Sequence, residues 1–170
     1  MIRRLFARTS ETPLPLGEPQ AGAIPYVIRD GVAVFLVVTS RGSGRWVFPK
    51  GGLMSGLTAA QSAACEAMEE AGVEGVIAEI PVGAYPDTKP TPAGMTSVSV
   101  AMYPLRVERQ LEDWPEKRKR RRHWATLPEL RRLLTTPGLL RLAELTQAQA
   151  LASAANDQVQ PQVKQAGQQG

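Results

Sequence analysis

Three glutamates, Glu66, Glu69 and Glu70, follow one another at helical spacing near the middle of the chain. Residues three and four positions apart are neighbours on a helix surface, so we expect the three carboxylates to share one face. Like charges held together cost stability, whereas Mg²⁺ binds carboxylate and phosphate oxygens together. The spacing therefore indicates metal-assisted chemistry on a phosphorylated substrate, with a solvated acidic helix face as the alternative.

The expected helix around these glutamates has recognisable ends. Thr58 and Gln61 form a capping-box pattern at its start, and Gly72 suits a left-handed stop at its end. Alanines recur on the opposite face, which favours close packing against a sheet. The segment Pro49-Lys50-Gly51-Gly52 precedes the helix. It predicts a tight loop whose backbone can approach a ligand and whose lysine supplies a cation.

The segment from Gly51 to Val73 resembles the Nudix box, which ends in Arg-Glu-aliphatic-X-Glu-Glu-X-Gly-aliphatic. The positions that match without a gap are Gly51, Glu66, Glu69, Glu70, Gly72 and Val73. Leu57 and Cys65 depart from the pattern, because the family has Glu and Arg there as an ion pair. Both partners are replaced together, so no unpaired charge remains. We expect an apolar Leu57–Cys65 contact in place of the pair.

The resemblance implies the roles of the box residues and of the loop before them. The metal, Mg²⁺ or Mn²⁺, would be held by Glu66, Glu69, Glu70 and the Gly51 carbonyl, and Glu69 or Glu70 would be the general base. Glu112, Asp113 and Glu116 are further candidates for the base, with solvated acids as the alternative. The predicted substrate-binding residues are Lys50, Gly52, Arg120, Arg121 and Arg122.

A second segment, LEDWPEKRKRRRHW from Leu111 to Trp124, is similar to diphosphoinositol polyphosphate phosphohydrolases. Members of that Nudix subgroup also cleave diadenosine polyphosphates. Six consecutive cations, Lys117 to Arg122, lie in this segment and suit a polyanionic small molecule, because arginine binds phosphate bidentately. A solvated loop or a nucleic-acid patch is the alternative for the run.

Length and composition agree with one small enzyme domain. The chain has 170 residues and a net charge of +4, with one cysteine and one histidine. An internal disulfide is therefore impossible, and a zinc site lacks its usual ligand set. A single cysteine fits the reducing cytoplasm, which is the predicted location. No apolar run approaches the roughly 20 residues needed to cross a bilayer, so no membrane partner is expected.

The hydrophobic pattern alternates strands and helices and predicts an α/β (α+β) fold. The Nudix resemblance implies an α/β/α sandwich with a mixed sheet. Strands are expected at 21–28, 32–38, 45–48, 73–80, 82–85, 95–107 and 122–125, with helices after the glycine loop, after Leu127 and from Pro137 to about 155. Residues 1–19 are expected to form a flexible arm, 20–155 the Nudix domain, and 156–170 a disordered Gln-rich tail.

Three functions remain open on these grounds. The first is a Mg²⁺-dependent pyrophosphohydrolase of the diphosphoinositol or dinucleoside polyphosphate type. The second is a Nudix hydrolase of nucleoside triphosphates, nucleotide sugars or capped RNA. The third is a catalytically weak module that senses phosphate or binds RNA, which the changes at Leu57 and Cys65 favour.

Overall fold

The computed structural model describes residues 16–166, and side-chain surroundings through residue 156. It contains eight strands and three helices. The strands are β1 (Gln20–Arg29), β2 (Val32–Thr39), β3 (Trp46–Val47), β4 (Lys50–Gly52), β5 (Val73–Ile77), β6 (Gly83–Thr91), β7 (Gly94–Gln110) and β8 (Arg122–Thr126). The helices are α1 (Ala59–Ala71), α2 (Leu127–Leu133) and α3 (Pro137–Ala166).

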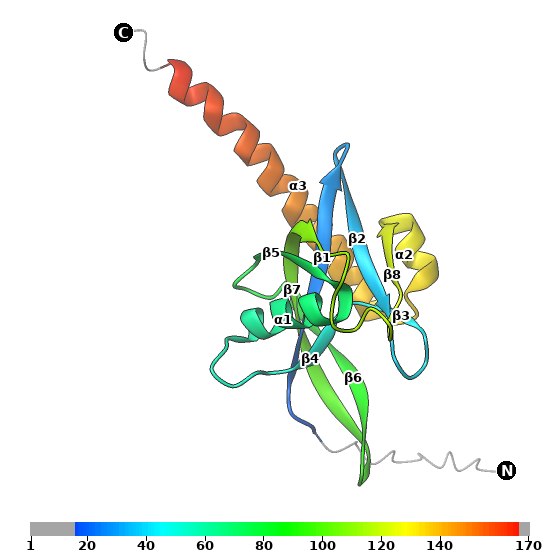
Figure 1. Cartoon of the computed structure of the whole chain (residues 1–170). Helices are drawn as coiled ribbons and strands as arrows, with labels where there is room; N and C mark the ends of the chain where they lie inside the picture. The colour runs from blue at the N-terminus through cyan, green and yellow to red at the C-terminus, as the bar shows by residue number, and fades with distance from the viewer. Residues whose placement is uncertain (1–15, 167–170) are drawn as a thin grey trace, which may run out of the picture.

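The strands form one mixed sheet whose main path is β3-β2-β1-β7-β5 (Figure 1). β1 and β7 run parallel, whereas β1 and β2 form an antiparallel hairpin through Asp30-Gly31, both at positive φ. β4 pairs with β1, β6 with β7, and β8 with β2. β4 pairs with the start of β1, and β6 pairs with the part of β7 that reaches the start of β1. The glycine loop and β6 therefore lie at the same end of the two central strands.

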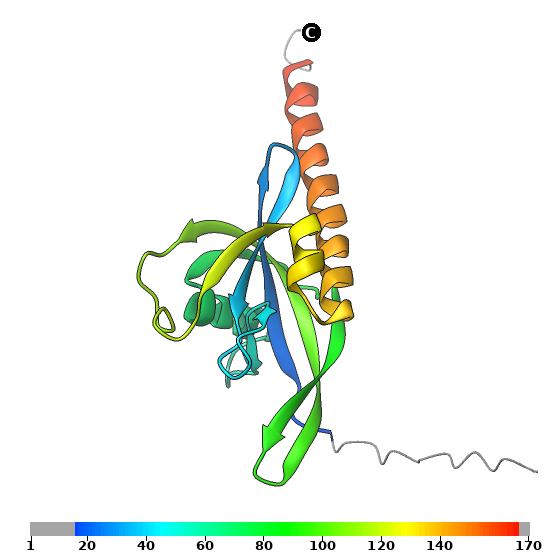
Figure 2. The same cartoon turned by 90° about the vertical axis from the view of Figure 1, so that its right-hand side faces the viewer.

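Helices cover both faces of this sheet, as Figure 2 shows. On one face the alanines of α1 (Ala60, Ala63, Ala67 and Ala71) pack with Leu36, Val38 and Leu105. On the other face Leu130 of α2 and Leu139 and Leu142 of α3 pack with Phe35 and Met102. This confirms the predicted mixed α/β sandwich.

The ends of α1 are those that the sequence predicts. The Thr58 side chain accepts a hydrogen bond from the Gln61 N–H at 3.1 Å, and the Gln61 side chain accepts one from the Thr58 N–H at 2.9 Å. Gly72 ends the helix in the left-handed conformation with φ of 64°. Both features depend on residues within one turn, which is why they can be recognised without a structure.

Some elements are longer or shorter than predicted. β6 continues past Tyr85 to Thr91, because it pairs residue by residue with the long strand β7, and β5 ends at Ile77. α3 continues to Ala166, well into the segment that we predicted to be disordered from residue 156. The four glutamines between residues 158 and 165 have good helix propensity, whereas the prediction rested on the Gly and Pro content and the low apolar content of the segment. The division into arm, domain and tail stays a prediction, and residues 1–15 of the arm lie outside the described residues.

Within residues 16–166, no helix combines the length and the apolar character needed to cross a bilayer.

Candidate active site

A cavity of about 870 Å³ lies where α1, β4, β6 and the loop between β2 and β3 meet. Its wall brings together most of the residues that the sequence singled out. They are Lys50, Gly51, Gly52, Glu66, Glu69, Glu70 and Arg120, joined by Glu116 from the loop that precedes β8. Three of the acidic side chains come from α1, and Asp87 of β6 adds another besides Glu116. The cationic side chains come from the surrounding loops and strands, so the cavity has charges of both signs.

Glu66 lies directly against the glycine loop. A β-carbon built on Gly51 would overlap the Glu66 carboxylate, so only glycine leaves that carboxylate its place beside the backbone. Burial raises the pKa of the Glu66 carboxyl, and the neighbouring Glu69 and Glu116 raise it further. The structure thus places Glu66, the first of the three matching glutamates, directly against Gly51.

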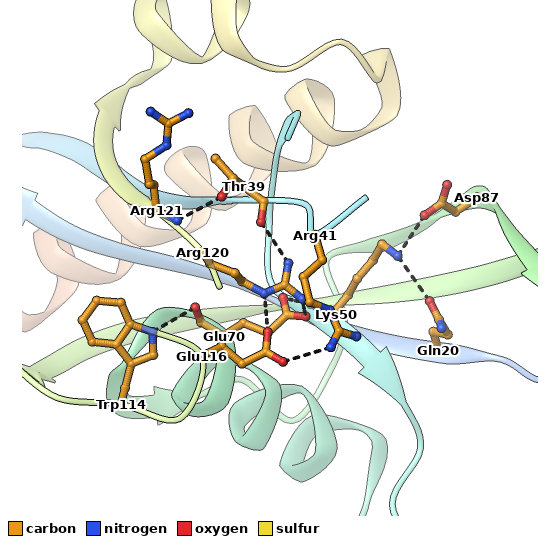
Figure 3. Close-up of polar contacts among 10 residues, drawn as sticks. All are labelled: Gln20, Thr39, Arg41, Lys50, Glu70, Asp87, Trp114, Glu116, Arg120 and Arg121. Atoms are coloured by element: carbon orange, nitrogen blue, oxygen red, sulfur yellow. Dashed lines mark hydrogen bonds and ion pairs between the residues drawn. The ribbon is translucent and has the colours of Figure 1, made fainter. Parts of the chain in front are cut away.

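Glu70 is the most buried of the three glutamates, with 7% of its surface exposed. Its Oε2 accepts a hydrogen bond from the backbone N–H of Lys50 at 3.3 Å, and its Oε1 forms an ion pair with Arg120 (Figure 3). Burial raises the pKa of the Glu70 carboxyl to about 7, although the Arg120 guanidinium opposes this effect. The fold therefore holds this carboxylate where ionisation is disfavoured and where added positive charge would stabilise it.

Arg120 is buried and fully engaged by the protein. Besides Glu70 it contacts Glu116, with Nε 2.5 Å from Oε2, and its Nη1 donates to the Thr39 carbonyl at 3.0 Å. Glu116 also pairs with Arg41 at 3.3 Å. Arg120 thus lies at the cavity as predicted, but in this structure its donors are directed at carboxylates and at a backbone oxygen.

Arg121 and Arg122 are placed differently from Arg120. Neither belongs to the cavity wall as the described residues form it. Arg121 is exposed, and Figure 3 shows its side chain pointing away from Glu70 and Glu116. Arg122 donates from Nη1 to the Ala71 carbonyl at 3.0 Å and from Nη2 to the Leu111 carbonyl at 2.8 Å. Contact of these two arginines with a substrate stays a prediction.

The loop between β7 and β8 supplies the hydrogen bonds that α1 lacks at its C-terminus. The Glu116 N–H donates to the Glu69 carbonyl at 3.0 Å, and the Trp114 indole donates to the Glu70 carbonyl at 3.2 Å. The Leu111 N–H donates to the Gly72 carbonyl at 2.8 Å. With Arg122 on Ala71, the last four carbonyls of the helix each have a donor. This loop therefore fixes the end of the helix that carries the glutamates.

Replacing Arg122 by glutamine is expected to lower the free energy of unfolding by about 2 kcal/mol, because charge-assisted bonds at a helix C-terminus are lost. Its guanidinium also lies 3.9 Å from the centre of the Trp114 ring, and that contact would be lost too. Denaturant titration measures the effect, and Arg121→Gln is the matched control, expected within about 0.5 kcal/mol of wild type. Unchanged stability with a raised KM would instead make Arg122 a substrate contact.

No motif in the sequence indicates the surroundings of Lys50. Its Nζ lies 2.9 Å from Asp87 Oδ2 and 3.4 Å from Gln20 Oε1. Asp87 comes from β6, and only the pairing of that strand with β7 brings it to the cavity. Arg41, Arg45 and Lys89 add further cations to the wall. Of the acidic candidates near the basic run, Glu116 lines the cavity, whereas Glu112 and Asp113 are exposed.

The family model of the NUDIX domain matches residues 18–148, most of the chain. The chain belongs to the Nudix family. Nudix hydrolase 12, mitochondrial, of Arabidopsis thaliana is 37% identical over 98 residues, which are 55% of this chain and 48% of that protein. Nudix hydrolase 16, mitochondrial, of the same plant is 35% identical over 126 residues, 64% of this chain and 68% of that protein. The chain thus spans about half the length of the first of these relatives.

Solved structures show the same Nudix fold. The C. elegans Ap4A hydrolase superposes with a TM-score of 0.55 at 20% identity, covering 78% of this chain and 98% of that one. The NUDIX domain of Shewanella oneidensis NrtR, solved with ADP ribose, gives 0.60 at 14% identity and covers 79% and 89%. At these identities the comparison establishes the fold and leaves the substrate open.

The donor set of the Nudix box fits a hard divalent cation. Five carboxylates border one cavity, and oxygen ligands of this kind suit Mg²⁺; they are those of Glu66, Glu69, Glu70, Asp87 and Glu116. Among the described residues, no three acidic or cysteine/histidine side chains already converge on one point. The ion pair between Glu70 and Arg120 is consistent with this, because it occupies an oxygen of one carboxylate. That Glu66, Glu69 and Glu70, with the Gly51 carbonyl, would hold a metal stays a prediction.

Of the two departures from the Nudix box, Leu57 lies two residues before α1 and Cys65 lies in the middle of that helix. Leu57 keeps 41% of its surface exposed, and Cys65 is half-buried. The predicted apolar contact between them stays a prediction.

Restoring the family ion pair with Leu57→Glu and Cys65→Arg tests whether the two positions interact. We expect the double mutant to be more stable than the sum of the single changes predicts, by about 0.5 kcal/mol or more, as for residues in contact. Thermal unfolding of the wild type, both single mutants and the double mutant closes the cycle. Strict additivity would show that the two side chains do not face each other.

Proposed function

We propose that this protein hydrolyses a phosphoanhydride bond in a polyphosphorylated substrate, of the dinucleoside polyphosphate or diphosphoinositol polyphosphate type, with Mg²⁺ as cofactor. The observation that carries the proposal is the cavity in which the box glutamates meet Lys50, Arg41 and Arg45. Membership of the Nudix family and the Nudix hydrolases among its relatives support the reaction class. The structural likeness to a C. elegans Ap4A hydrolase is compatible with the dinucleoside polyphosphate class.

Mg²⁺ bound by Glu66, Glu69 and Glu70 would supply a Lewis acid for the phosphate oxygens and a water of lowered pKa. The other roles belong to the chain. Lys50 and the cavity arginines bind and orient the phosphates. Glu70, or Glu69 beside it, is the proposed acceptor of the proton of the attacking water.

The composition of the cavity wall favours recognition of phosphate over recognition of a base. Its volume of about 870 Å³ accommodates a ligand larger than one mononucleotide. The aromatic side chains in its wall, Phe48 and Tyr85, are buried and leave little ring surface for stacking. Arg41, Arg45 and Lys89 instead add positive charge to the wall, and in this proposal they bind the remote phosphates of a long substrate.

A binding module with little turnover is the second candidate. It is favoured by the altered box positions Leu57 and Cys65 and by the engagement of Glu70 with Arg120. Such a protein would bind polyphosphates in the same cavity without cleaving them.

The test is the release of phosphate and nucleotide by the purified protein, with and without Mg²⁺. Diadenosine polyphosphates, diphosphoinositol polyphosphates, nucleoside triphosphates and nucleotide sugars are compared under the same conditions. We expect Mg²⁺-dependent cleavage of one of the first two classes. Cleavage confined to nucleoside triphosphates or nucleotide sugars would support another Nudix hydrolase. Binding of these compounds without any cleavage would favour the module.

A further inference from the structure

The ion pair between Arg120 and Glu70 joins two side chains that have different predicted functions. Neither side chain can perform its predicted function while the pair holds it. Glu70 is a predicted metal ligand, and Arg120 is a predicted substrate contact, yet in this structure each satisfies the other. Oε1 of Glu70 faces Arg120, while Oε2 is held by the Lys50 N–H. A metal cation bound to Oε1 would be brought against the Arg120 guanidinium, so the two cations compete for this oxygen.

The remaining contacts of Arg120 keep the free-energy cost of separating it from Glu70 low. Its Nε stays 2.5 Å from Glu116 Oε2, and its Nη1 stays 3.0 Å from the Thr39 carbonyl. The buried guanidinium therefore keeps a carboxylate partner and a backbone acceptor after Glu70 is withdrawn, which avoids the large cost of an unpaired buried charge. Only Nη2 loses its partner, and it does so at the cavity wall.

We propose that Arg120 is an internal counter-cation of the metal site, which holds Glu70 in the metal-free protein and gives it up when a divalent cation binds. In the absence of metal, Arg120 neutralises a carboxylate that the fold has buried. In its presence, the freed Nη2 becomes a donor for a substrate phosphate. Metal loading and phosphate binding are then coupled through one side chain. This inference rests on the proposed function and extends it to the regulation of the same site.

The experiment measures Mg²⁺ binding by calorimetry at a pH well above 7, where the Glu70 carboxyl is ionised. Four proteins form a cycle: wild type, Arg120→Gln, Glu70→Gln and the double mutant. We expect Arg120→Gln to tighten Mg²⁺ binding by about tenfold, within the usual range of coupling between two sites. In the Glu70→Gln background the same change should have a much smaller effect, because the oxygen for which the two cations compete has lost its charge and only the weaker influence of Arg120 on Glu66 remains.

Two further variants distinguish the exchange of Arg120 for Mg²⁺ on Glu70 from a general effect of positive charge near the site. Arg121→Gln removes a neighbouring positive charge that points away from the site, and it should leave the Mg²⁺ affinity unchanged. Arg120→Lys keeps the charge but lacks the planar fork, so its affinity should lie between those of wild type and Arg120→Gln. If Arg120→Gln tightened Mg²⁺ binding equally in the wild-type and Glu70→Gln backgrounds, the exchange on Glu70 would be overturned. General charge repulsion between Arg120 and Mg²⁺ would then explain the result.

The wild-type protein provides a test that no folding defect can obscure. With ¹⁵N-labelled arginine, the side-chain signal of Arg120 is assigned by its loss in Arg120→Lys and followed as Mg²⁺ is added. We expect this signal to move at the Mg²⁺ concentration that half-saturates the calorimetric site, while the Arg122 signal stays in place. A signal of Arg120 unmoved at saturating Mg²⁺ would overturn the inference alone. Failure of the wild type to bind Mg²⁺ at all would overturn the proposed function with it.

Discussion

Replacing Glu70 by glutamine is expected to lower Mg²⁺-dependent turnover by about a hundredfold to a thousandfold, the range found when one charge-stabilising group is removed from an active site. Glutamine has nearly the same shape but cannot offer an ionised oxygen to a cation or accept a proton from water. Its carbonyl oxygen can still accept from the Lys50 N–H or from Arg120, so the contacts of the fold persist.

Stability should change little in this variant. Glu70 is only 7% exposed, and its burial raises its pKa, so removing the charge also removes a desolvation cost. The measurement is kcat and KM on the substrate found in the release assay, together with the thermal midpoint. Glu112→Gln, which changes an exposed acid on the nearby loop, is the matched control and should keep full activity. Full activity of Glu70→Gln would contradict its assignment as a metal ligand.

The parts of this structure that could be predicted from the sequence are the local ones. The capping box of Thr58 and Gln61, the stop at Gly72 and the Asp30-Gly31 turn each depend on a few adjacent residues. Helical spacing likewise placed Glu66, Glu69 and Glu70 at one cavity. These features follow from backbone geometry alone, and distant contacts do not override them.

The roles of the three arginines could be predicted only in part. In sequence they are equivalent cations, and all were expected to bind phosphate. In the structure Arg120 is buried, Arg121 is exposed and Arg122 is half-buried, and only Arg122 belongs to β8. The predicted strand at 122–125 likewise includes only Arg122, so it did not distinguish the three arginines. Nor could it provide the partners of Arg120 and Arg122, because Glu70 and Ala71 lie about fifty residues away in the chain.

The contact between Lys50 and Asp87 could not be predicted from the sequence. It depends on three separate strand pairings, of β4 with β1, β1 with β7 and β7 with β6. Neither residue carries a motif that names the other. A long-range register of this kind is set by the whole sheet, and the residues at its edges meet as a consequence.

The tightest steric constraint in the site leads to the second large effect. Gly51→Ala is expected to weaken Mg²⁺ binding by about tenfold to a hundredfold, the usual loss when the groups that orient a metal ligand are disturbed. The added methyl group would overlap the Glu66 carboxylate, which is the flexible end of its side chain and must turn away. The fold is therefore expected to remain intact, and the loss to fall on metal affinity and on the turnover that depends on it.

Gly52→Ala is a matched control for this change, because a β-carbon on Gly52 would have no atom within 4 Å. It lies on the same strand β4 and alters the backbone freedom of the loop to the same extent. Calorimetry with Mg²⁺ and thermal unfolding of both variants separate the two possible consequences. A loss of affinity in both would indicate that loop flexibility matters. A loss in Gly51→Ala alone, at unchanged thermal midpoint, would locate the effect where Gly51 meets Glu66 and so support the two predicted ligands there, the Gly51 carbonyl and the Glu66 carboxylate, without any use of catalysis.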